Sequence, residues 1–290
     1  MATDKWLDWI RKRRYGGNKI IAEESVKQLS QVRDKILEGA KIREGDTVLD
    51  IGTGDGLLGF GALQKVGSGG KIIFSDISES CVEACKEIYS SMQSLNRAEF
   101  IVTPSQKLPF DDSSIDVIIF RSVLIYIKEK QDCFKEFYRV LKPGGRISFF
   151  EPINIFTKRH QPKASFYGHD ISPIKDIWDK VKEAYPKRDD ENDPMMNFDE
   201  DDLFRFTREA GFSELLMTIN ALSQKMSEGP NWEFIFKAAP NPNVPSLEEA
   251  ANKTLSPEEN KRFVEFMKQK IDNEPSIQLI SLCYFNAVKE

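Results

Sequence analysis

The sequence predicts an α/β fold: a doubly wound, mostly parallel sheet of seven strands with helices on both faces, an antiparallel last strand and helical lid insertions. Short apolar runs rich in β-branched residues alternate with longer segments that carry apolar residues at helical spacing, which is typical of βαβ units. The first unit begins at residues 47–56, where an apolar run breaks into three alternating glycines and resumes as a helical pattern.

Composition and charge limit the classes of function. The chain has 290 residues, 40% hydrophobic and 30% charged, as in an ordinary soluble globular enzyme. Its net charge of −5 argues against nucleic acid as the main partner, because phosphate binding needs a basic excess. The basic run at residues 11–14 is interpreted as a solvated helix face. We expect a small-molecule partner and no membrane partner; the oligomeric state is left open.

Cysteine usage and the first residues bear on the compartment. Four cysteines without a paired framework fit a reducing environment, and no set of residues stands at metal-ligand spacing, so no metal site is predicted. The N-terminal residues lack the basic and apolar regions of a secretory signal, and no apolar run approaches membrane-spanning length. We expect a cytoplasmic protein.

The elements expected up to residue 152 alternate regularly. Residues 1–45 are predicted to form an N-terminal helical cap, with a loop at 15–18 and a helix at 20–37. The expected strands lie at residues 47–51, 71–77, 99–103, 115–121 and 146–151. The expected helices between them lie at residues 57–63, 78–91 and 130–141.

The pattern changes after Pro152. Residues 154–200 are polar and are interpreted as a long connection or helical lid, with a helix at 174–184. A helix at 199–210 precedes a sixth strand at 212–222, and Ser256-Pro257 is a helix start. The last strand is expected at 277–288. We therefore expect one domain over residues 46–290, with helical insertions at about 153–200 and 228–275.

The glycine turn at 52–56 is suited to a nucleoside ligand, and two ligands compete. A nicotinamide or flavin dinucleotide favours Gly-x-Gly-x-x-Gly at the start of the helix. From Gly52 this pattern fails, because position 57 is leucine; from Gly54 it matches, but that register begins four residues beyond Asp50. The match is therefore a poor indication of a dinucleotide.

Charge favours a different nucleoside. Asp46, Asp50 and Asp55 are expected to cluster around the turn, and residues 45–56 contain no lysine or arginine. A dianionic pyrophosphate is disfavoured in such surroundings. S-adenosylmethionine carries positive charge on its sulfonium and its amino group, and its one carboxylate can accept hydrogen bonds from the turn's backbone.

Several motifs together carry a family resemblance. Residues 48–56, Val-Leu-Asp-Ile-Gly-Thr-Gly-Asp-Gly, resemble motif I of the class I S-adenosylmethionine-dependent methyltransferases, which have a Rossmann-like fold. The agreement continues in order through residues 74–78, 108–111 and 115–118. It ends with Arg-Val-Leu-Lys-Pro-Gly-Gly at 139–145, a turn that resembles small-molecule methyltransferases.

The resemblance implies S-adenosyl-L-methionine as cofactor and assigns residues to it. The implied cofactor-binding residues are Asp50, Gly52, Thr53, Gly54, Asp76, Ile77, Ser105, Gln106, Arg121 and Ser122. The backbone of residues 52–54 would follow the methionine portion, and Asp76 would accept hydrogen bonds from both ribose hydroxyls. Many relatives have an acidic residue at the position of Pro104, which leaves Ser105 to contact the adenine.

The implied activity is transfer of a methyl group to a small-molecule acceptor by in-line displacement, with the acceptor atom (O, N, C or S) undetermined. No catalytic base is assigned. His160 and His169, in the segment after the fifth strand, and Tyr126, after the fourth, are candidates; Tyr15 is a further candidate for lining the pocket. Exposed loop histidines are the competing interpretation.

Two alternatives to a methyltransferase remain open. One is a non-catalytic methyltransferase-fold protein that binds a partner through its acidic helical insertions. The other is an NAD(P)-dependent oxidoreductase that uses the glycine turn at 52–56 for a dinucleotide.

Overall fold

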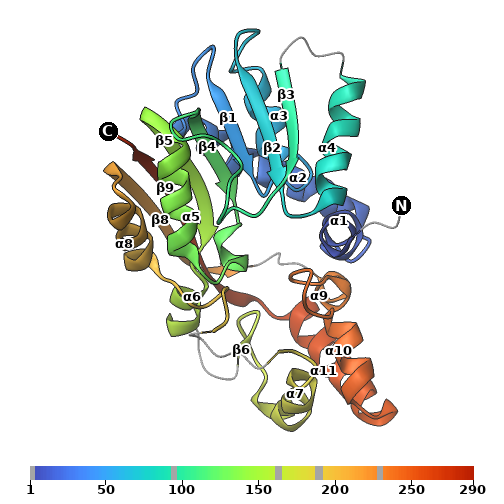
Figure 1. Cartoon of the computed structure of the whole chain (residues 1–290). Helices are drawn as coiled ribbons and strands as arrows, with labels where there is room; N and C mark the ends of the chain where they lie inside the picture. The colour runs from blue at the N-terminus through green and yellow to red at the C-terminus, as the bar shows by residue number, and fades with distance from the viewer. Residues whose placement is uncertain (1–3, 93–96, 161–164, 187–191, 227–230) are drawn as a thin grey trace.

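The central element is a seven-stranded sheet in the order β3-β2-β1-β4-β5-β9-β8 (Figure 1). The computed structural model describes residues 4–92, 97–160, 165–186, 192–226 and 231–290. The strands are β1 (Thr47–Ile51), β2 (Lys71–Asp76), β3 (Arg97–Val102), β4 (Ile115–Arg121), β5 (Leu141–Pro152), β8 (Ser213–Met226) and β9 (Ser276–Val288). β1 to β5 are parallel and β9 is antiparallel to both of its neighbours, which confirms the predicted fold class.

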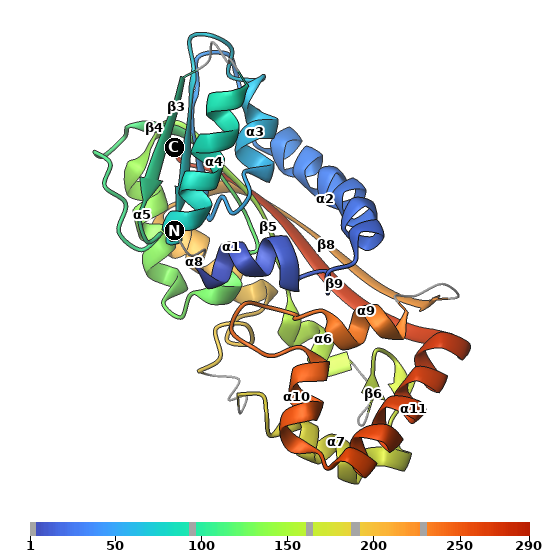
Figure 2. The same ribbon diagram turned by 90° about the vertical axis from the view of Figure 1, so that its right-hand side faces the viewer.

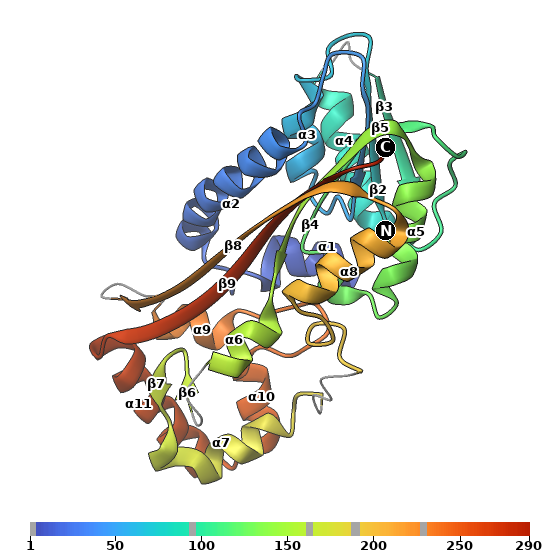
Figure 3. The same cartoon turned by 90° about the vertical axis from the view of Figure 1, so that its left-hand side faces the viewer.

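Helices cover both faces of this sheet (Figures 2 and 3). On one face lie α2 (Lys19–Gly39), α3 (Leu57–Leu63) and α4 (Glu79–Ser91), and on the other lie α5 (Lys130–Val140) and α8 (Glu200–Ala210). Alternation along β4 explains the two layers: Val117 and Ile119 pack under α2 and α3, whereas Ile118 and Phe120 pack under α5. A parallel strand buried on both faces has the continuous apolar sequence seen here.

The N-terminal segment and a second group of helices lie beyond the carboxyl ends of β1–β5. The segment consists of α1 (Lys5–Asp8) and a π-helical turn (Trp9–Arg13). The second group, here called the helical unit, lies at the far end of the antiparallel strands β8 and β9 (Figure 3). It contains α7 (Lys175–Lys182), α9 (Trp232–Lys237), α10 (Leu247–Thr254) and α11 (Pro257–Asn273), which share a core of their own.

Local signals placed several of these helices correctly. Ser256 caps α11 through a reciprocal pair of hydrogen bonds with Glu259, and Asp199 caps α8 in the same way with Asp202. Gly211 ends α8 in the left-handed conformation, at a φ of 108°. These ends require only residues close in sequence, so the sequence pattern was sufficient to predict them.

Other elements differ from expectation. β5 begins at Leu141, because Leu141 already pairs with Ile115 before the turn at 142–145 interrupts the register. Within the predicted connection at 154–200, the helix α6 (Asn154–His160) and the short hairpin β6 (Ser165–Phe166) to β7 (His169–Asp170) were not predicted. The parts of the predicted cap, lid and insertion at residues 1–3, 161–164, 187–191 and 228–230 lie outside the described residues.

One predicted placement is wrong. Asp46 does not join the acidic residues at the glycine turn, because it lies at the opposite end of β1, about 13 Å of strand away from Asp50. Its carboxylate is paired there with the guanidinium of Arg146, which also donates to the carbonyl of Ala40 at 3.1 Å. The pair is buried and links the loop before β1 to β5.

We expect Asp46→Ala to lower the free energy of unfolding by about 3–5 kcal/mol, because Arg146 would keep its charge in a buried site without its carboxylate. Urea unfolding followed by circular dichroism measures the loss. Lys12→Ala is the matched control: the lysine of the Lys12–Asp8 pair is 71% exposed, and its removal should cost below about 1 kcal/mol. Similar losses in the two variants would contradict the buried-pair interpretation.

Candidate functional site

The candidate site lies where the winding of the sheet reverses. From β1 the chain continues to β2 and β3 on one side, and then crosses back to β4 and β5 on the other. In open α/β sheets, ligands bind outside the carboxyl ends of the strands at such a switch point. The glycine turn after β1 meets the loop after β4 here: a Cβ on Gly52 would lie 2.5 Å from Cγ2 of Val123. No larger residue fits at Gly52, whose φ is 62°.

Asp50 holds the glycine turn from inside. Its Oδ2 accepts hydrogen bonds from the Thr53 hydroxyl at 2.7 Å and from the backbone N–H of Gly59, in α3, at 2.9 Å. The side chain is 1% exposed, and burial raises the pKa of Asp50 to about 7. Oδ1 has no partner among the described residues. Asp50 and Thr53 therefore shape the turn and do not present their side chains to solvent.

Asp76 and Ile77, at the end of β2, face the same edge. The carboxylate of Asp76 accepts from the backbone N–H of Gly54 and from that of Ser78, both at 2.9 Å. It is 9% exposed, and burial raises its pKa. Ile77 is 64% exposed, a large apolar side chain in water beside a fixed carboxylate. The carboxylate of Asp76 can accept hydrogen bonds from the hydroxyls of a polar ring, and the side chain of Ile77 can pack against an apolar ring.

The loop after β3 carries Ser105 and Gln106, the two residues predicted to contact the adenine. The Ser105 side chain is buried, with its hydroxyl 3.5 Å from the sulfur of Cys133 in α5. Gln106 is half-buried in the turn that follows. The adenine contacts of both residues stay predictions.

The N-terminal segment covers the glycine turn with one helix face. Trp6, Ile10 and Arg14 recur every four residues and so lie on the same side. The Trp6 ring lies edge-on to Tyr126, with ring centroids 4.9 Å apart, and Ile10 Cδ1 lies 3.2 Å from the position of a Cβ on Gly54. The segment is anchored through Asp4, which accepts a 2.5 Å hydrogen bond from the hydroxyl of Ser78.

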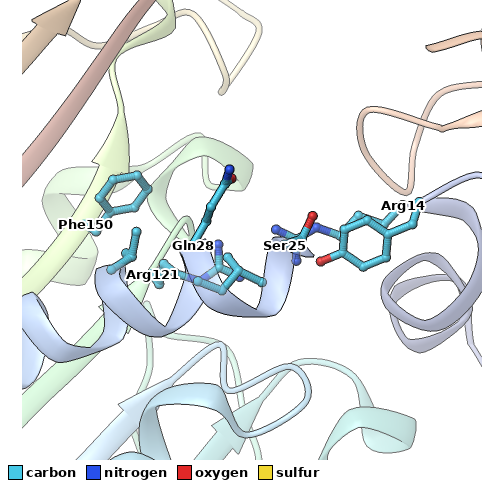
Figure 4. A pocket seen from close by; sticks show the side chains of 8 residues that line it. Arg14, Ser25, Gln28, Arg121 and Phe150 are labelled. Atoms are coloured by element: carbon cyan, nitrogen blue, oxygen red, sulfur yellow. The ribbon is translucent and has the colours of Figure 1, made fainter. Parts of the chain in front are cut away.

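A pocket of about 260 Å³ opens between α2, the N-terminal segment and the ends of β4 and β5 (Figure 4). Its polar lining comes from Arg14, Tyr15, Ser25, Gln28 and Arg121. Its apolar lining comes from Leu29, Val32 and Phe150. In Figure 4, Phe150 and Arg14 lie at opposite ends of the group, with Arg121 and Gln28 between them.

The loop that carries Arg121 and Ser122 is fixed by a buried carboxylate. Ser122 has a left-handed φ of 55°, rare for a residue with a side chain, and its N–H bonds to the carbonyl of Phe150 at 2.9 Å. Glu151 Oε1 accepts from the N–H groups of Val123 at 2.7 Å and Leu124 at 2.8 Å. Glu151 is fully buried, and burial raises its pKa to about 7.

The three candidate bases lie in different places. Tyr126 is at the site, and burial raises its pKa to about 12. His160 is exposed at the end of α6, with Nδ1 2.9 Å from the carbonyl of Phe156. His169 is buried in the β6–β7 hairpin, where the nearby charges that affect it are Glu274 and Lys270 of α11 and its C-terminal cap. The structure thus brings only Tyr126 of the three to the switch point.

Two residues of the site were missed from the sequence. Arg14 was assigned to a solvated face with its neighbours; Arg11 and Lys12 are exposed, but Arg13 pairs with Glu249 and Arg14 lines the pocket. Its four-residue spacing from Ile10 and Trp6 was the available signal. Glu151 looked like a strand residue in an apolar run, and the charge within that run was the sign of a buried role.

The described part of the chain holds no group of three or more histidine, cysteine, aspartate or glutamate side chains placed to bind a metal ion. No helix within it combines the length and apolar character needed to cross a bilayer. The four cysteines are all free and all buried.

Comparisons with curated proteins find methyltransferases. A stretch of 110 residues is 36% identical to the ubiquinone/menaquinone biosynthesis C-methyltransferase UbiE of Francisella tularensis subsp. novicida, covering 38% of this chain and 44% of the relative. The UbiE of Hydrogenovibrio crunogenus is 30% identical over 141 residues, covering 47% of this chain and 54% of the relative. This chain thus spans about half the length of the curated relatives it matches.

Solved structures share the fold. A putative methyltransferase from Bacillus halodurans matches with a TM-score of 0.54 at 18% identity, over 89% of this chain and 99% of that one. The YcgJ protein from Bacillus subtilis also matches with a TM-score of 0.54, at 13% identity, over 90% of this chain and 98% of that one.

A family model described as a methyltransferase domain matches residues 42–191, just over half of the chain and the part that contains the glycine turn, Asp76 and the pocket arginine of β4. The motifs predicted from the sequence lie within this range in their expected order. The chain belongs to this family, the class I S-adenosylmethionine-dependent methyltransferases.

Proposed function

We propose that this chain transfers a methyl group from S-adenosyl-L-methionine to a small-molecule acceptor. The observation that carries the proposal is the pairing of a fixed carboxylate, Asp76, with the glycine turn at the switch point, joined by the hydrogen bond from Gly54 N–H to Asp76 Oδ2 at 2.9 Å. Family membership supports the reaction type. The acceptor, the cytoplasmic location and the absence of a nucleic-acid partner are parts of the same proposal.

The residues present fit this cofactor. Oδ2 of Asp76 accepts from the N–H of Gly54 and Oδ1 from that of Ser78, and a carboxylate has about four acceptor positions in all, so it can also accept from a ribose hydroxyl. The exposed side chain of Ile77 would be covered by the adenine, which removes apolar surface from water. The backbone of Gly52, Thr53 and Gly54 would follow the methionine portion, with Arg121 and Ser122 at its far end. Asp50 would act through the turn that it orders.

When bound, S-adenosylmethionine supplies a methyl group already activated by the adjacent sulfonium. The chain's contribution is alignment and exclusion of water. Ile10 covers the turn at Gly54, Trp6 packs against Tyr126, and the loop after β4, which begins at the left-handed Ser122, lies against Gly52 through Val123. With a pKa of about 12, Tyr126 keeps its proton at neutral pH, so it would orient an acceptor by hydrogen bonding and not as a base.

Isothermal titration tests the cofactor assignment. We expect the chain to bind S-adenosylmethionine and S-adenosylhomocysteine and not NAD. Asp76→Ala should weaken both interactions by about 1.5–3 kcal/mol, the usual contribution of hydrogen bonds to a charged group. Asp34→Ala, which removes an exposed carboxylate paired with Arg33 on α2, is the matched control. Unchanged affinity in a folded Asp76→Ala variant would reject the ribose role, and NAD binding alone would favour an oxidoreductase.

The pH dependence of stability tests the anchor of the loop after β4. Because burial raises the pKa of Glu151 from its ordinary value of 4.5 to about 7, the folded chain holds a proton that the unfolded chain releases between these values. Stability from this group is therefore lost as pH rises from 4.5 to 7. The glutamine of Glu151→Gln cannot titrate. As pH rises from 4.5 to 7, we therefore expect the free energy of unfolding of the variant, relative to that of the unsubstituted chain, to increase by roughly 1–3 kcal/mol. Urea unfolding at pH 5, 6, 7 and 8 measures the difference; parallel pH profiles would contradict the prediction.

A further inference from the structure

We propose that the methyl acceptor is an anion, with its carboxylate or phosphate held between Arg14 and Arg121 and its apolar body against Leu29, Val32 and Phe150. The inference rests on the proposed function, since it assigns the pocket beside the glycine turn to the acceptor of that reaction. It adds the chemical class of the acceptor, which neither the family nor the motifs specify.

The two arginines stand out because they lack an acidic partner. Among the described residues, no carboxylate lies within ion-pair distance of either guanidinium; that of Arg14 lies 5.3 Å from the ring centroids of Trp9 and Tyr15. The other half-buried or buried arginines of the described residues are paired with acids. These are Arg13 with Glu249, Arg33 with Asp34, Arg139 with Glu136 and Asp112, and Arg146 with Asp46.

The surroundings of Arg121 are unfavourable for a cation. Burial lowers its pKa, and the positive charge of Arg14 lowers it further. Asp55 and Glu151 are near enough to act in the opposite direction, but neither forms an ion pair with it. A desolvated guanidinium is stable only when it is paired or hydrogen-bonded. An anion bound between Arg14 and Arg121 would provide that pairing and remove the repulsion between them.

The rest of the pocket limits the shape of this anion. Leu29 and Val32 of α2 and Phe150 of β5 provide an apolar wall, while Ser25 and Gln28 add polar groups on the same helix face as Leu29 and Val32. A pocket of about 260 Å³ has room for a small metabolite. A ligand with one charged end and one apolar end matches the arrangement in Figure 4, where Phe150 and Arg14 lie at opposite ends.

The pocket also has the right position for an acceptor. Arg121 ends β4, the strand that pairs with β1, and it is close enough to Asp55 of the glycine turn for their charges to interact. Tyr126, whose ring contacts Trp6, lies near enough to both arginines to be affected by their charges. An anion at Arg14 and Arg121 would therefore lie next to the proposed cofactor site, at the end of the methionine portion where Arg121 borders both ligands.

Titration calorimetry on the full chain saturated with S-adenosylhomocysteine tests the proposal. The probes are benzoate and phenyl phosphate, with benzyl alcohol as the neutral analogue and inorganic phosphate as the anion without an apolar body. We expect benzoate or phenyl phosphate to bind at least about tenfold more tightly than benzyl alcohol and than inorganic phosphate. Whichever of the two binds more tightly identifies the anionic group. Equal binding of the neutral and charged probes would overturn the proposal.

Three variants locate the binding. Arg14→Met and Arg121→Met should each lower the affinity for the charged probe by about 10–100-fold and leave the affinity for benzyl alcohol unchanged. Arg11→Met is the matched control, because it removes the same charge from an exposed position of the same segment. Thermal melting shows whether each variant is folded. Because Arg14 and Arg121 lie in different elements, one variant can still test the proposal if the other does not fold.

Binding of S-adenosylhomocysteine, measured first, separates this proposal from the proposed function. If the unsubstituted chain does not bind it, the proposed function fails, while benzoate binding to the free chain still reports on the pocket. If Arg121→Met loses S-adenosylhomocysteine and keeps its preference for the charged probe, the arginine serves the cofactor's carboxylate and the acceptor assignment is overturned. Loss of that preference in Arg14→Met, with S-adenosylhomocysteine affinity unchanged, supports it.

Discussion

The site depends on how the carboxylate of Asp50 joins a strand end to a helix. One oxygen bonds both the Thr53 hydroxyl and the N–H of Gly59, so the turn between β1 and α3 is closed on itself. The helix can approach this closely because position 59 is glycine: a Cβ there would lie 3.0 Å from Asp50 Oδ2 and 2.3 Å from the ring of Phe74. With the turn fixed in this way, the N–H of Gly54 can reach Asp76. The neighbouring strand ends are thereby held in one arrangement before any ligand binds.

The N-terminal segment connects this site to the helical unit. The indole N–H of Trp9 donates to the carbonyl of Ala239 at 2.8 Å, the N–H of Ala239 donates to the carbonyl of Arg13 at 2.9 Å, and Arg13 pairs with Glu249 of α10. In the same segment, Ile10 faces the glycine turn and Trp6 contacts Tyr126. Residues 5–14 are therefore packed between the two parts of the molecule, and the helical unit supports the cover of the site without lining the pocket itself.

The sequence was sufficient wherever structure depends on neighbours along the chain. β1, β4 and α3 were predicted with their observed bounds, since a buried parallel strand and a glycine turn are encoded within a few residues. It was insufficient where position depends on distant partners. Asp46 was grouped with Asp50 by closeness in sequence, although the rise of the strand separates them and Arg146 pairs with it. The role of Arg14 follows only from the return of the N-terminal segment to the end of β4.

The position of Ile10 against Gly54 links the cover of the glycine turn to the wall of the pocket. The segment that carries Ile10 also carries Arg14 and Tyr15, which line the pocket. While the segment is displaced, the pocket lacks two of its walls. The cover of the glycine turn and two residues of the pocket wall therefore belong to one segment, so a single displacement of that segment would open both.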